Sequence, residues 1–377
     1  MKNQKICIVG DGLAGLSTTL TLKNLDLDID VFYKKINQSN QDVRTTAISE
    51  TNFQFLGKHI KFKKDLFWAC KKISLFYENK DKKINFLNYA GLKNFLMYIF
   101  ENNKVKSFIL KELKKQKNVR FINKEITSID YKDTSICLNN KKFHYDIIIL
   151  CLGNNSKIYN NFLKSRNIIK NYNEVALTGV IEHNLKIENP SQYFLDDGPL
   201  AILPFKKNKS SFVWSVKNNF YIKNKKAIKN IIKYKIEDIF TKKKCKIKNL
   251  QTFEINLNLK TQYSRNNVLV FGEGIHSIHP VAGQGFNLVI RDIKKLNELI
   301  SNNLKLGLQI KNSSILNDFY NSRSAENNIF GLGVDLTHLF FKNKNFMNPL
   351  KNIVLNNIGD NKIIKILSRS ISDKGLL

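Results

Sequence analysis

The chain opens with a short hydrophobic run that leads directly into a glycine-rich turn, KICIVGDGLAG (residues 5–15). The run has the composition of a strand that is buried on both faces of a sheet. Residues 16–23 follow with the spacing of a helix, and a second short strand is expected at residues 29–33. A strand, a glycine turn, a helix and a strand in this order are typical of the first unit of a dinucleotide-binding fold.

The glycines of this turn have a spacing that suits phosphate binding. Gly10, Gly12 and Gly15 follow the pattern G-x-G-x-x-G, which permits a tight turn and lets backbone N–H groups approach a pyrophosphate at the positive end of the helix. An acidic residue is expected about 20 positions later, where it would bind the ribose hydroxyls. Tyr33 ends the second strand instead and is followed by Lys34, so this position offers one hydrogen bond from a phenol and no carboxylate.

A second glycine-rich segment, GEGIHSIHPVAGQGFNLVIRD (residues 272–292), is more specific. A predicted strand ends just before Glu273, a turn rich in Gly and Pro follows, and a helix is expected from about Gly285. This order brings bare backbone and the positive end of a helix up to a flat ligand. His276 and His279 have a spacing seen in metal sites. Because no matching set of cysteines or acids accompanies them, we expect no metal and predict hydrogen bonds within the loop.

The order of the predicted strands indicates two interleaved domains in an α/β fold. Strands of the dinucleotide-binding type occur at the start, near residue 150 and near residue 270, with a β-rich block between them. We predict a nucleotide-binding domain from residues 1–65, 90–172 and 261–310, a β-rich domain from residues 66–89 and 173–260, and a helical region over residues 311–377. Within the first domain, residues 90–117 are predicted to form a pair of helices, because apolar residues recur at helical spacing.

Composition limits the classes of function. The 377 residues include 62 Lys and Arg against 31 Asp and Glu, which gives a formal net charge of +31. Such a charge permits binding to nucleic acid or to an anionic membrane, but it also arises from compositional drift in which Lys and Asn rise together. The basic residues are spread along the chain without a recognisable motif, so no nucleic-acid partner is expected. Five scattered cysteines without a C-x-x-C pair predict a reducing, cytoplasmic location.

These motifs resemble those of a known family. Residues 272–292 resemble the second FAD motif of class A flavin monooxygenases, G-D-x-x-H-x-x-H-P-x-x-G-Q-G-x-N-x-G-x-x-D, and are most similar to the ubiquinone-biosynthesis hydroxylases. Residues 44–49 resemble their R-x-x-A-L/I-S motif, and residues 197–204 resemble a stretch of their substrate domain. The similarity runs nearly from end to end. Phe286 favours the 2-polyprenyl-6-methoxyphenol hydroxylase branch.

The resemblance implies a fold like that of p-hydroxybenzoate hydroxylase: a Rossmann-like FAD-binding domain interleaved with a β-sheet substrate domain, followed by C-terminal helices. It also implies hydroxylation of the aromatic ring of a polyprenyl phenol in ubiquinone biosynthesis, through a flavin hydroperoxide, with NAD(P)H as the reductant. No side chain is expected to act as a chemical catalyst. The expected FAD-binding residues are Gly10, Gly12, Leu13, Ala14, Gly15, Tyr33, Arg44, Glu273, Gly283, Gln284, Gly285, Phe286 and Asn287. His279, Pro280 and Val281 would line the flavin face, and Pro204 and Trp214 would border the substrate.

The chain also departs from the family pattern. Tyr33 stands where an acid is usual, Leu152 replaces the acid of an A-D-G-x-x-S motif, and Glu273 replaces an Asp. An alternative is therefore a catalytically impaired relative that acts as a scaffold among other quinone-biosynthesis proteins. Residues 329–355 combine an apolar face with lysines, which suits attachment to the inner face of an anionic membrane. Ordinary packing of this region into the core explains the same pattern equally well.

Overall fold

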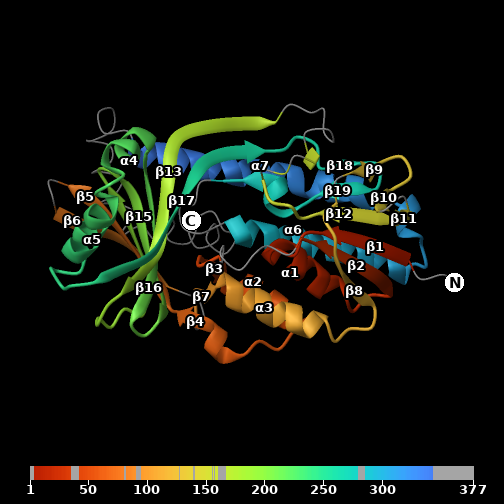
Figure 1. The fold of residues 1–377 in the computed structure, drawn as a ribbon, viewed down its shortest axis with the longest axis horizontal. Helices are drawn as coiled ribbons and strands as arrows, with labels where there is room; N and C mark the ends of the chain where they lie inside the picture. Colours follow the sequence, from red (N-terminus) through yellow and green to blue (C-terminus); the bar gives the residue numbers. More distant parts are fainter. Residues whose placement is uncertain are drawn as a thin grey trace.

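A computed structural model describes residues 4–34, 42–79, 82–90, 95–126, 128–138, 141–154, 156, 158–159, 167–278 and 285–342, with side chains as far as residue 333. Figure 1 shows two lobes side by side, each built on its own large sheet. Helix α7 (Ile315–Lys342) runs along the top of both lobes in this view. None of the described helices is both long enough and apolar enough to cross a lipid bilayer.

The first lobe contains a six-stranded sheet whose centre is parallel. Its order is β18 (Ser264–Arg265), β19 (Val268–Val270), β12 (Ile147–Leu150), β1 (Gln4–Val9), β2 (Leu27–Tyr33) and β8 (Val119–Asn123). The strands from β19 to β8 run parallel to one another, and β18 alone is antiparallel. The three strands expected at the start of the chain, near residue 150 and near residue 270 are therefore adjacent, which confirms the predicted interleaving of the chain.

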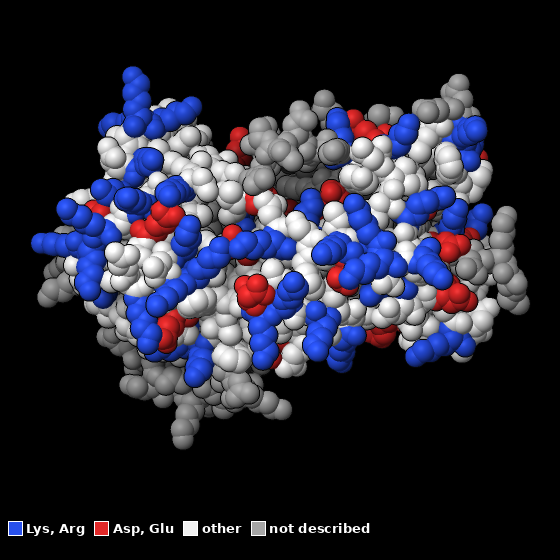
Figure 2. Space-filling view, turned by 60° about the horizontal axis from the view of Figure 1, so that its bottom comes forward, with Lys and Arg blue, Asp and Glu red and all other residues white. Residues whose placement is uncertain are grey.

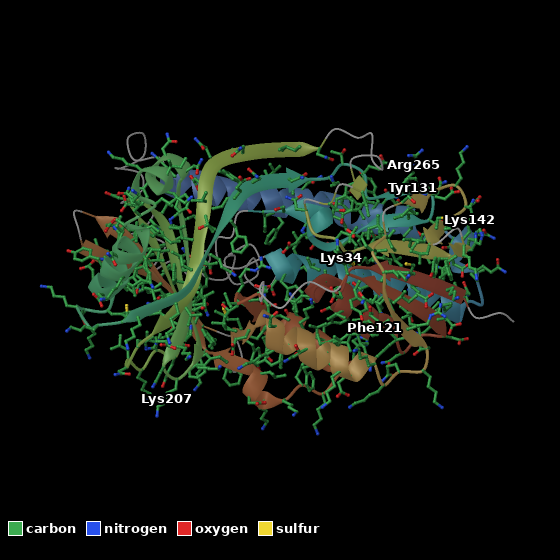
Figure 3. All side chains as sticks on the ribbon, in the orientation of Figure 1. Lys34, Phe121, Tyr131, Lys142, Lys207 and Arg265 are labelled. Atoms are coloured by element: carbon green, nitrogen blue, oxygen red, sulfur yellow. The ribbon has the colours of Figure 1, made fainter. Side chains whose placement is uncertain are left out.

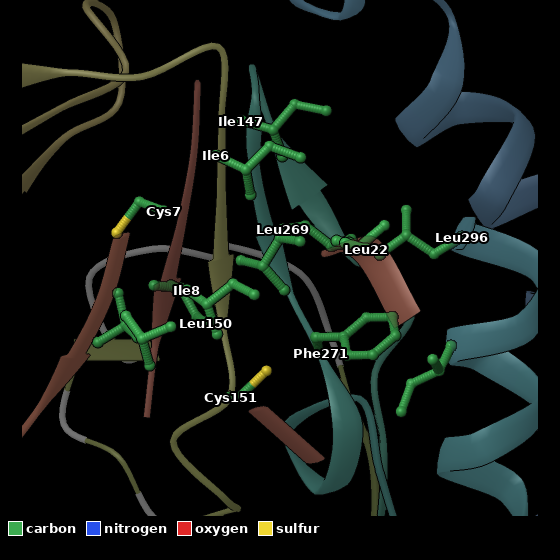
Figure 4. Close-up of a cluster of buried hydrophobic side chains, with 14 of the residues drawn as sticks. Ile6, Cys7, Ile8, Leu22, Ile147, Leu150, Cys151, Leu269, Phe271 and Leu296 are labelled. Atoms are coloured by element: carbon green, nitrogen blue, oxygen red, sulfur yellow. The ribbon is translucent and has the colours of Figure 1, made fainter. Parts of the chain in front are cut away.

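Helices cover this sheet and exclude water from its strands. Ile6 and Ile8 of β1 are completely buried, as are Ile147 and Leu150 of β12. Figure 4 shows these side chains in one cluster with residues from α1 (Leu13–Leu22) and α6 (Gly285–Lys305). Each fully buried side chain of this size contributes about 1.5–3 kcal/mol of hydrophobic free energy, so the strand ends that carry both glycine turns are firmly held.

The second lobe is an eight-stranded sheet. Its order is β20 (His276–Ser277), β17 (Lys246–Leu259), β13 (Ile168–Glu182), β16 (Lys209–Lys217), β15 (Gly198–Lys206), β14 (Ser191–Leu195), β5 (Lys72–Asn79) and β6 (Lys82–Ala90). Helices α4 (Asn218–Asn224) and α5 (Ile228–Ile239) cover its outer face. Ile228, Ile232 and Ile236 recur every fourth residue along α5, and all three are buried against the sheet. The opposite face of the sheet is turned toward the first lobe (Figure 1).

A small antiparallel sheet lies between the lobes. It consists of β3 (Thr45–Ser49), β7 (Met97–Glu101) and β4 (Phe67–Cys70), with α2 (Glu50–Gly57) after β3 and α3 (Asn102–Leu113) after β7. Leu203 of the large sheet packs against Ala47, Cys70 and Ile99 of the small one. Strand β4, which the predicted boundary assigns to the β-rich domain, pairs with β7 instead.

The prediction of a helix pair over residues 90–117 is wrong in its first half. Met97–Glu101 is the central strand of the small sheet, and only Asn102–Leu113 is helical. Ile99 and Phe100 are both buried, because one side of β7 faces Leu203 and the other faces the hydrophobic core of the first lobe. A strand buried on both faces has no alternating pattern, so a short apolar run of this kind reads equally well as a helix.

Candidate cofactor site

The first glycine turn presents an open helix terminus. Helix α1 begins at Leu13 with Gly12 as its N-cap, and no side chain caps it. Gly10 has a φ of +115°, and a Cβ placed there would lie 2.3 Å from the carbonyl oxygen of Cys151. A Cβ on Gly15 would lie 2.0 Å from the oxygen of Gly10, whereas a Cβ on Gly12 would meet nothing within 4 Å. The fold itself requires Gly10 and Gly15, while Gly12 borders open space where N–H groups face outward.

The second glycine turn lies directly against the first. Residues Gly272–Gly274 form a short 3₁₀ turn at the carboxyl end of β19. A Cβ on Gly272 would lie only 2.9 Å from the Cβ of Ala14, in the first turn of α1. Phe271 donates its N–H to the oxygen of Leu150 over 3.0 Å, which holds the turn to the neighbouring strand. The two glycine segments, more than 250 residues apart in sequence, therefore meet at one edge of the sheet.

Glu273 presents a free carboxylate at this edge. It is exposed, and within the described residues its side chain makes no hydrogen bond or ion pair. Its charge reaches Arg44, whose pKa is raised mainly by a hydrogen bond to Asp42 and further by the fields of Asp42 and Glu273. An unpartnered carboxylate beside an open helix terminus suits a ligand that offers hydroxyl groups, such as a ribityl or ribose chain.

Arg44 is held at the junction of the lobes, just before β3. Its Nε donates to Asp42 Oδ1 over 2.7 Å and its NH2 group donates to Asp42 Oδ2 over 2.9 Å. The guanidinium also lies over the ring of Phe253 in β17, 5.1 Å from the ring centre. One edge and one face of the guanidinium are thus used by the protein. The remaining N–H groups could bind a phosphate oxygen.

Asn287 holds the small sheet against helix α6. Its Oδ1 accepts from the N–H of Ser49 and from the Asn52 amide, each over 2.9 Å, and its Nδ2 donates to the oxygen of Ala47 over 3.0 Å. The side chain is buried and engaged with protein groups, so what the structure shows for Asn287 is a positioning role. Its neighbour Phe286 packs edge-on against Phe100, and Gly285 is the first residue of the helix.

Two departures from the family pattern lie at the ends of β2 and β12, the strands on either side of β1. Tyr33 is half-buried at the end of β2 and packs edge-on against Phe121, while Lys34 beside it forms an ion pair with Glu125. Lys34 and Phe121 are labelled in Figure 3. Leu152 packs onto the hydrophobic core of the first lobe, and its N–H donates to the hydroxyl of Tyr159 over 3.2 Å. Leu152 therefore supports packing at a position where an acid would bind ligands.

Sequence reasoning missed Tyr159, whose side chain packs against the second glycine turn at Gly274. The residue is buried, its hydroxyl donates to the oxygen of Leu150 over 3.3 Å, and burial raises the pKa of its phenol. A Cβ on Gly274 would lie 2.7 Å from that hydroxyl. Gly274 is therefore small because the tyrosine approaches it, and no sequence signal other than the Gly-x-Gly pair marks this contact.

His276 forms a buried network instead of the predicted bonds within the loop. Its Nε2 lies 2.6 Å from Asp292 Oδ2 in α6, and Arg323 Nε of α7 donates to Asp292 Oδ1 over 2.7 Å. Asn327 joins the same carboxylate over 3.2 Å. Burial alone would raise the pKa of Asp292, but the charges and hydrogen bonds of His276 and Arg323 more than offset it, so the pKa is lowered. The network ties the second turn to two helices.

The residues expected to line the flavin face lie outside the described part of the chain. These are His279, Pro280 and Val281, together with the expected cofactor residues Gly283 and Gln284. The structure does show where this segment starts. Ile278 packs against a buried cluster that includes Ala176 and Leu257 of the large sheet. The second glycine segment thus passes from the first lobe to the inner face of the second.

The predicted substrate residues Trp214 and Pro204 lie on the other face of the large sheet. Trp214 belongs to the core beneath α5 and packs edge-on against Phe220 of α4, with ring centres 5.9 Å apart. Pro204 is buried two residues after Ile202, which belongs to the same core, so strand alternation turns it to that face. The prediction that these residues border the substrate is therefore corrected: both point away from the first lobe.

Comparisons with known proteins agree with this geometry. A family model described as FAD binding domain matches residues 168–309. The chain is 25% identical over 331 residues to ubiquinone biosynthesis monooxygenase COQ6 of Dictyostelium discoideum, covering 69% of this chain and 65% of that protein. It is 30% identical over 156 residues to 3-demethoxyubiquinol 3-hydroxylase of Escherichia coli, covering 40% of this chain and 39% of the relative. The match thus spans between about two fifths and two thirds of the length of these relatives.

Solved structures show the same fold at low sequence identity. p-Nitrophenol 4-monooxygenase PnpA of Pseudomonas putida superposes with a TM-score of 0.80 at 14% identity, covering 99% of both chains. HpxO of Klebsiella pneumoniae, solved with FAD and uric acid, superposes with a TM-score of 0.73 at 13% identity, covering 99% of this chain and 98% of the other. These matches confirm the predicted fold class. The relatives in sequence are named as a monooxygenase and a hydroxylase, which does not favour the alternative of a scaffold protein. Residues 168–309 thus match an FAD binding domain, and the chain is similar in sequence to monooxygenases and hydroxylases that are named for ubiquinone biosynthesis.

Proposed function

We propose that this chain hydroxylates the aromatic ring of a polyprenyl phenol in ubiquinone biosynthesis, with FAD as cofactor and NAD(P)H as reductant. The observation that carries the proposal is the contact between the two glycine turns, where Gly272 lies against Ala14 beside the open space at Gly12. The relatives named for ubiquinone biosynthesis supply the substrate class.

The residues at this edge fit FAD. Backbone N–H groups at the start of α1 would hold the pyrophosphate, and the free carboxylate of Glu273 would accept hydrogen bonds from hydroxyls of the cofactor. Arg44, oriented by Asp42, would add a positive charge near the phosphates. When bound, FAD supplies the activation of oxygen that the protein itself lacks. The task of the chain is then to exclude water and to hold the ring of the substrate against the cofactor.

Reconstitution tests this proposal. Purified protein mixed with FAD is expected to retain yellow colour after gel filtration and to oxidise NAD(P)H faster when 2-prenylphenol is present, with a hydroxylated product detected by mass spectrometry. The Glu273→Ala variant should bind FAD more weakly, while Glu254→Ala, an exposed acid on β17, serves as the matched control. Protein that stays colourless at saturating FAD would exclude the proposal.

We further propose that the protein works at the inner face of an anionic membrane, where its lipid-soluble substrate and other quinone-biosynthesis proteins are accessible. Figure 2, which brings the underside of Figure 1 forward, shows Lys and Arg side chains spread across the described part of that face, in excess over acidic ones. The labelled basic residues Lys34, Lys142, Lys207 and Arg265 lie at separate places (Figure 3), so the attraction would be diffuse. Helix α7 adds exposed apolar side chains, with Ile329 66% and Leu332 44% exposed. An exposed apolar helix face and a basic surface together favour attachment to anionic lipid.

Flotation with vesicles tests the membrane proposal. At low salt the protein should float with vesicles that contain phosphatidylserine, remain at the bottom with purely phosphatidylcholine vesicles, and be released by high salt. The double variant Ile329→Asp and Leu332→Asp should float poorly, whereas Ile222→Asp on helix α4, where Ile222 is 62% exposed, should behave as the wild type. Recovery only in the soluble fraction at low salt would refute this part of the proposal.

A further inference from the structure

The two faces of the large sheet differ in the size of their side chains. The face under α4 and α5 carries large residues, namely Leu177, Leu200, Ile202, Phe212 and Trp214. On the opposite face of the same three strands, several of the alternate residues are small. Ala176 and Thr178 of β13, Val213 and Ser215 of β16, and Ala201 of β15 form what we call the small-residue area. Strand pairing joins them directly, because Ala176 pairs with Ser215, Thr178 with Val213, and Val213 with Ala201.

The small-residue area faces the first lobe at the cofactor site. The hydroxyl of Ser211, next along this face of β16, hydrogen-bonds the hydroxyl of Thr45 at the start of β3. Phe253, which pairs with Ala176, carries the guanidinium of Arg44 over its ring. Ile278, at the start of the segment expected to line the flavin, packs against the buried cluster that contains Ala176, and Val213 packs against the same cluster. The area therefore lies among groups that belong to, or lead into, the cofactor site.

Gln192 of β14 borders this area with an unused amide. It pairs with Ala201 on one side and Leu75 on the other, so its side chain projects from the same face. The residue is only 2% exposed, yet its Oε1 has no hydrogen-bond partner, and no described residue contacts the amide by a hydrogen bond. Leaving a buried amide unsatisfied is unfavourable, and such a group in a native structure needs an explanation, of which a bound ligand is one.

We propose that the Gln192 amide hydrogen-bonds an oxygen on the ring of the phenolic substrate, while the ring lies over the small-residue area. An amide both accepts and donates, so its oxygen can accept a hydrogen bond from a phenol hydroxyl while its NH2 group donates one to a neighbouring ring oxygen. Gln192 would then select an oxygenated ring, and the small side chains would leave room for it. This inference rests on the proposed function and deepens it by naming a specificity-determining residue on this chain.

Ligand binding to the FAD-loaded protein tests the role of Gln192. The probes are 2-prenylphenol and prenylbenzene, which lacks the hydroxyl, and binding is followed through the visible spectrum of FAD and by calorimetry. The wild type should prefer the phenol about tenfold. In Gln192→Leu the Kd for the phenol should rise about three- to tenfold, that for prenylbenzene should stay unchanged, and the FAD Kd should be unaltered. Gln309→Leu, an exposed glutamine, is the matched control.

Thermal unfolding separates this role from a structural one. Because Gln192→Leu removes an unsatisfied polar group, the Tm of the ligand-free variant should equal or exceed that of the wild type. A lower Tm with an unchanged preference for the phenol would show that the amide serves the fold, and would overturn the inference. Retention of the preference at any Tm would overturn it as well.

A second variant tests the small-residue area. Ala201→Leu adds three carbons to its centre and should weaken both probes more than tenfold while the FAD Kd stays unchanged. Ala227→Leu, at an exposed position before α5, is the control. Unchanged probe binding in Ala201→Leu would contradict the placement of the ring. If the FAD-loaded wild type binds neither probe, the proposed substrate class fails together with this inference, whereas normal wild-type binding with unaffected variants refutes the inference alone.

Discussion

Replacing Gly12 by alanine is expected to leave the protein folded and to weaken FAD binding about a hundredfold, equivalent to about 2.7 kcal/mol. A Cβ at this position meets no protein atom within 4 Å, and Gly12 has a φ of −68°, which alanine adopts without strain. The methyl group would instead occupy the open side of the helix terminus, where the pyrophosphate must approach the backbone closely. Fluorescence titration with FAD measures the affinity, and denaturant unfolding of the cofactor-free protein measures stability.

The matched control is Gly10→Ala in the same turn. There a Cβ would lie 2.3 Å from the Cys151 oxygen at a φ of +115°, so the whole β1–β12 edge must shift. We expect its free energy of unfolding to fall by about 2–4 kcal/mol, from strain and steric overlap. The two variants should thus separate binding from folding within three residues. Equal loss of stability in both, or normal FAD binding by Gly12→Ala, would contradict the assignment of the open space to the cofactor.

The parts of the site that sequence predicts well are those where backbone geometry imposes residue type. Gly10 and Gly15 are recognisable because any side chain there would overlap backbone atoms. The alignment of β19 with β12 and β1 follows from three short apolar runs that are buried on both faces. Such constraints act locally, so a single sequence shows them without knowledge of the rest of the fold.

The face of a strand is less predictable than its existence. Strand β16 lies within the predicted β-rich block, but which of its alternate residues face the cofactor depends on what covers the sheet. Large residues such as Trp214 pack under α5, and the small ones between them face the first lobe. An aromatic side chain suggests a ligand when read alone. Here Trp214 alternates with the smaller Val213 and Ser215, which shows that they lie on opposite faces of the strand. Choosing the large aromatic residue as the ligand contact selected the face that packs against the helices.

The side-chain network around Asp292 was not predictable for a different reason. The sequence places Asp292 at the end of a recognisable motif, and His276 at its beginning, but Arg323 lies in a helix of ordinary composition. The three side chains meet only after α7 packs on α6, so nothing local specifies the contact. Asn287 illustrates the same limit, because its three partners come from β3 and α2, more than 230 residues earlier.

Removal of the Asp292 carboxylate is expected to lower the free energy of unfolding by about 3–5 kcal/mol, the usual effect of leaving a buried charge without its partner. In Asp292→Ala, Arg323 would remain buried with only the half-exposed Glu326 as an acidic partner among the described residues, and His276 Nε2 would lose its only hydrogen bond there. Asp133→Ala, which removes an exposed carboxylate 3.3 Å from Lys142, is the control and should change stability little. Denaturant unfolding at pH 7 compares the three proteins.

The difference in unfolding free energy between the wild type and Asp292→Asn should depend on pH, and the direction of that dependence reports the charge state of Asp292 in the folded protein. The pKa of Asp292 is lower in the folded state than the ordinary value of about 3.9, so its contribution is complete above about pH 4 and is lost as pH falls through the folded pKa. The stability gap between wild type and Asp292→Asn should therefore stay constant from about pH 7 to pH 5 and narrow below pH 4. His276, which bonds Asp292, lies three residues after Glu273. Weakening this bond should loosen the turn that carries Glu273, so the variant should also bind FAD more weakly at pH 7. A gap that widens in acid would mean that Asp292 is protonated in the native protein, and the network would then hold the turn through neutral hydrogen bonds.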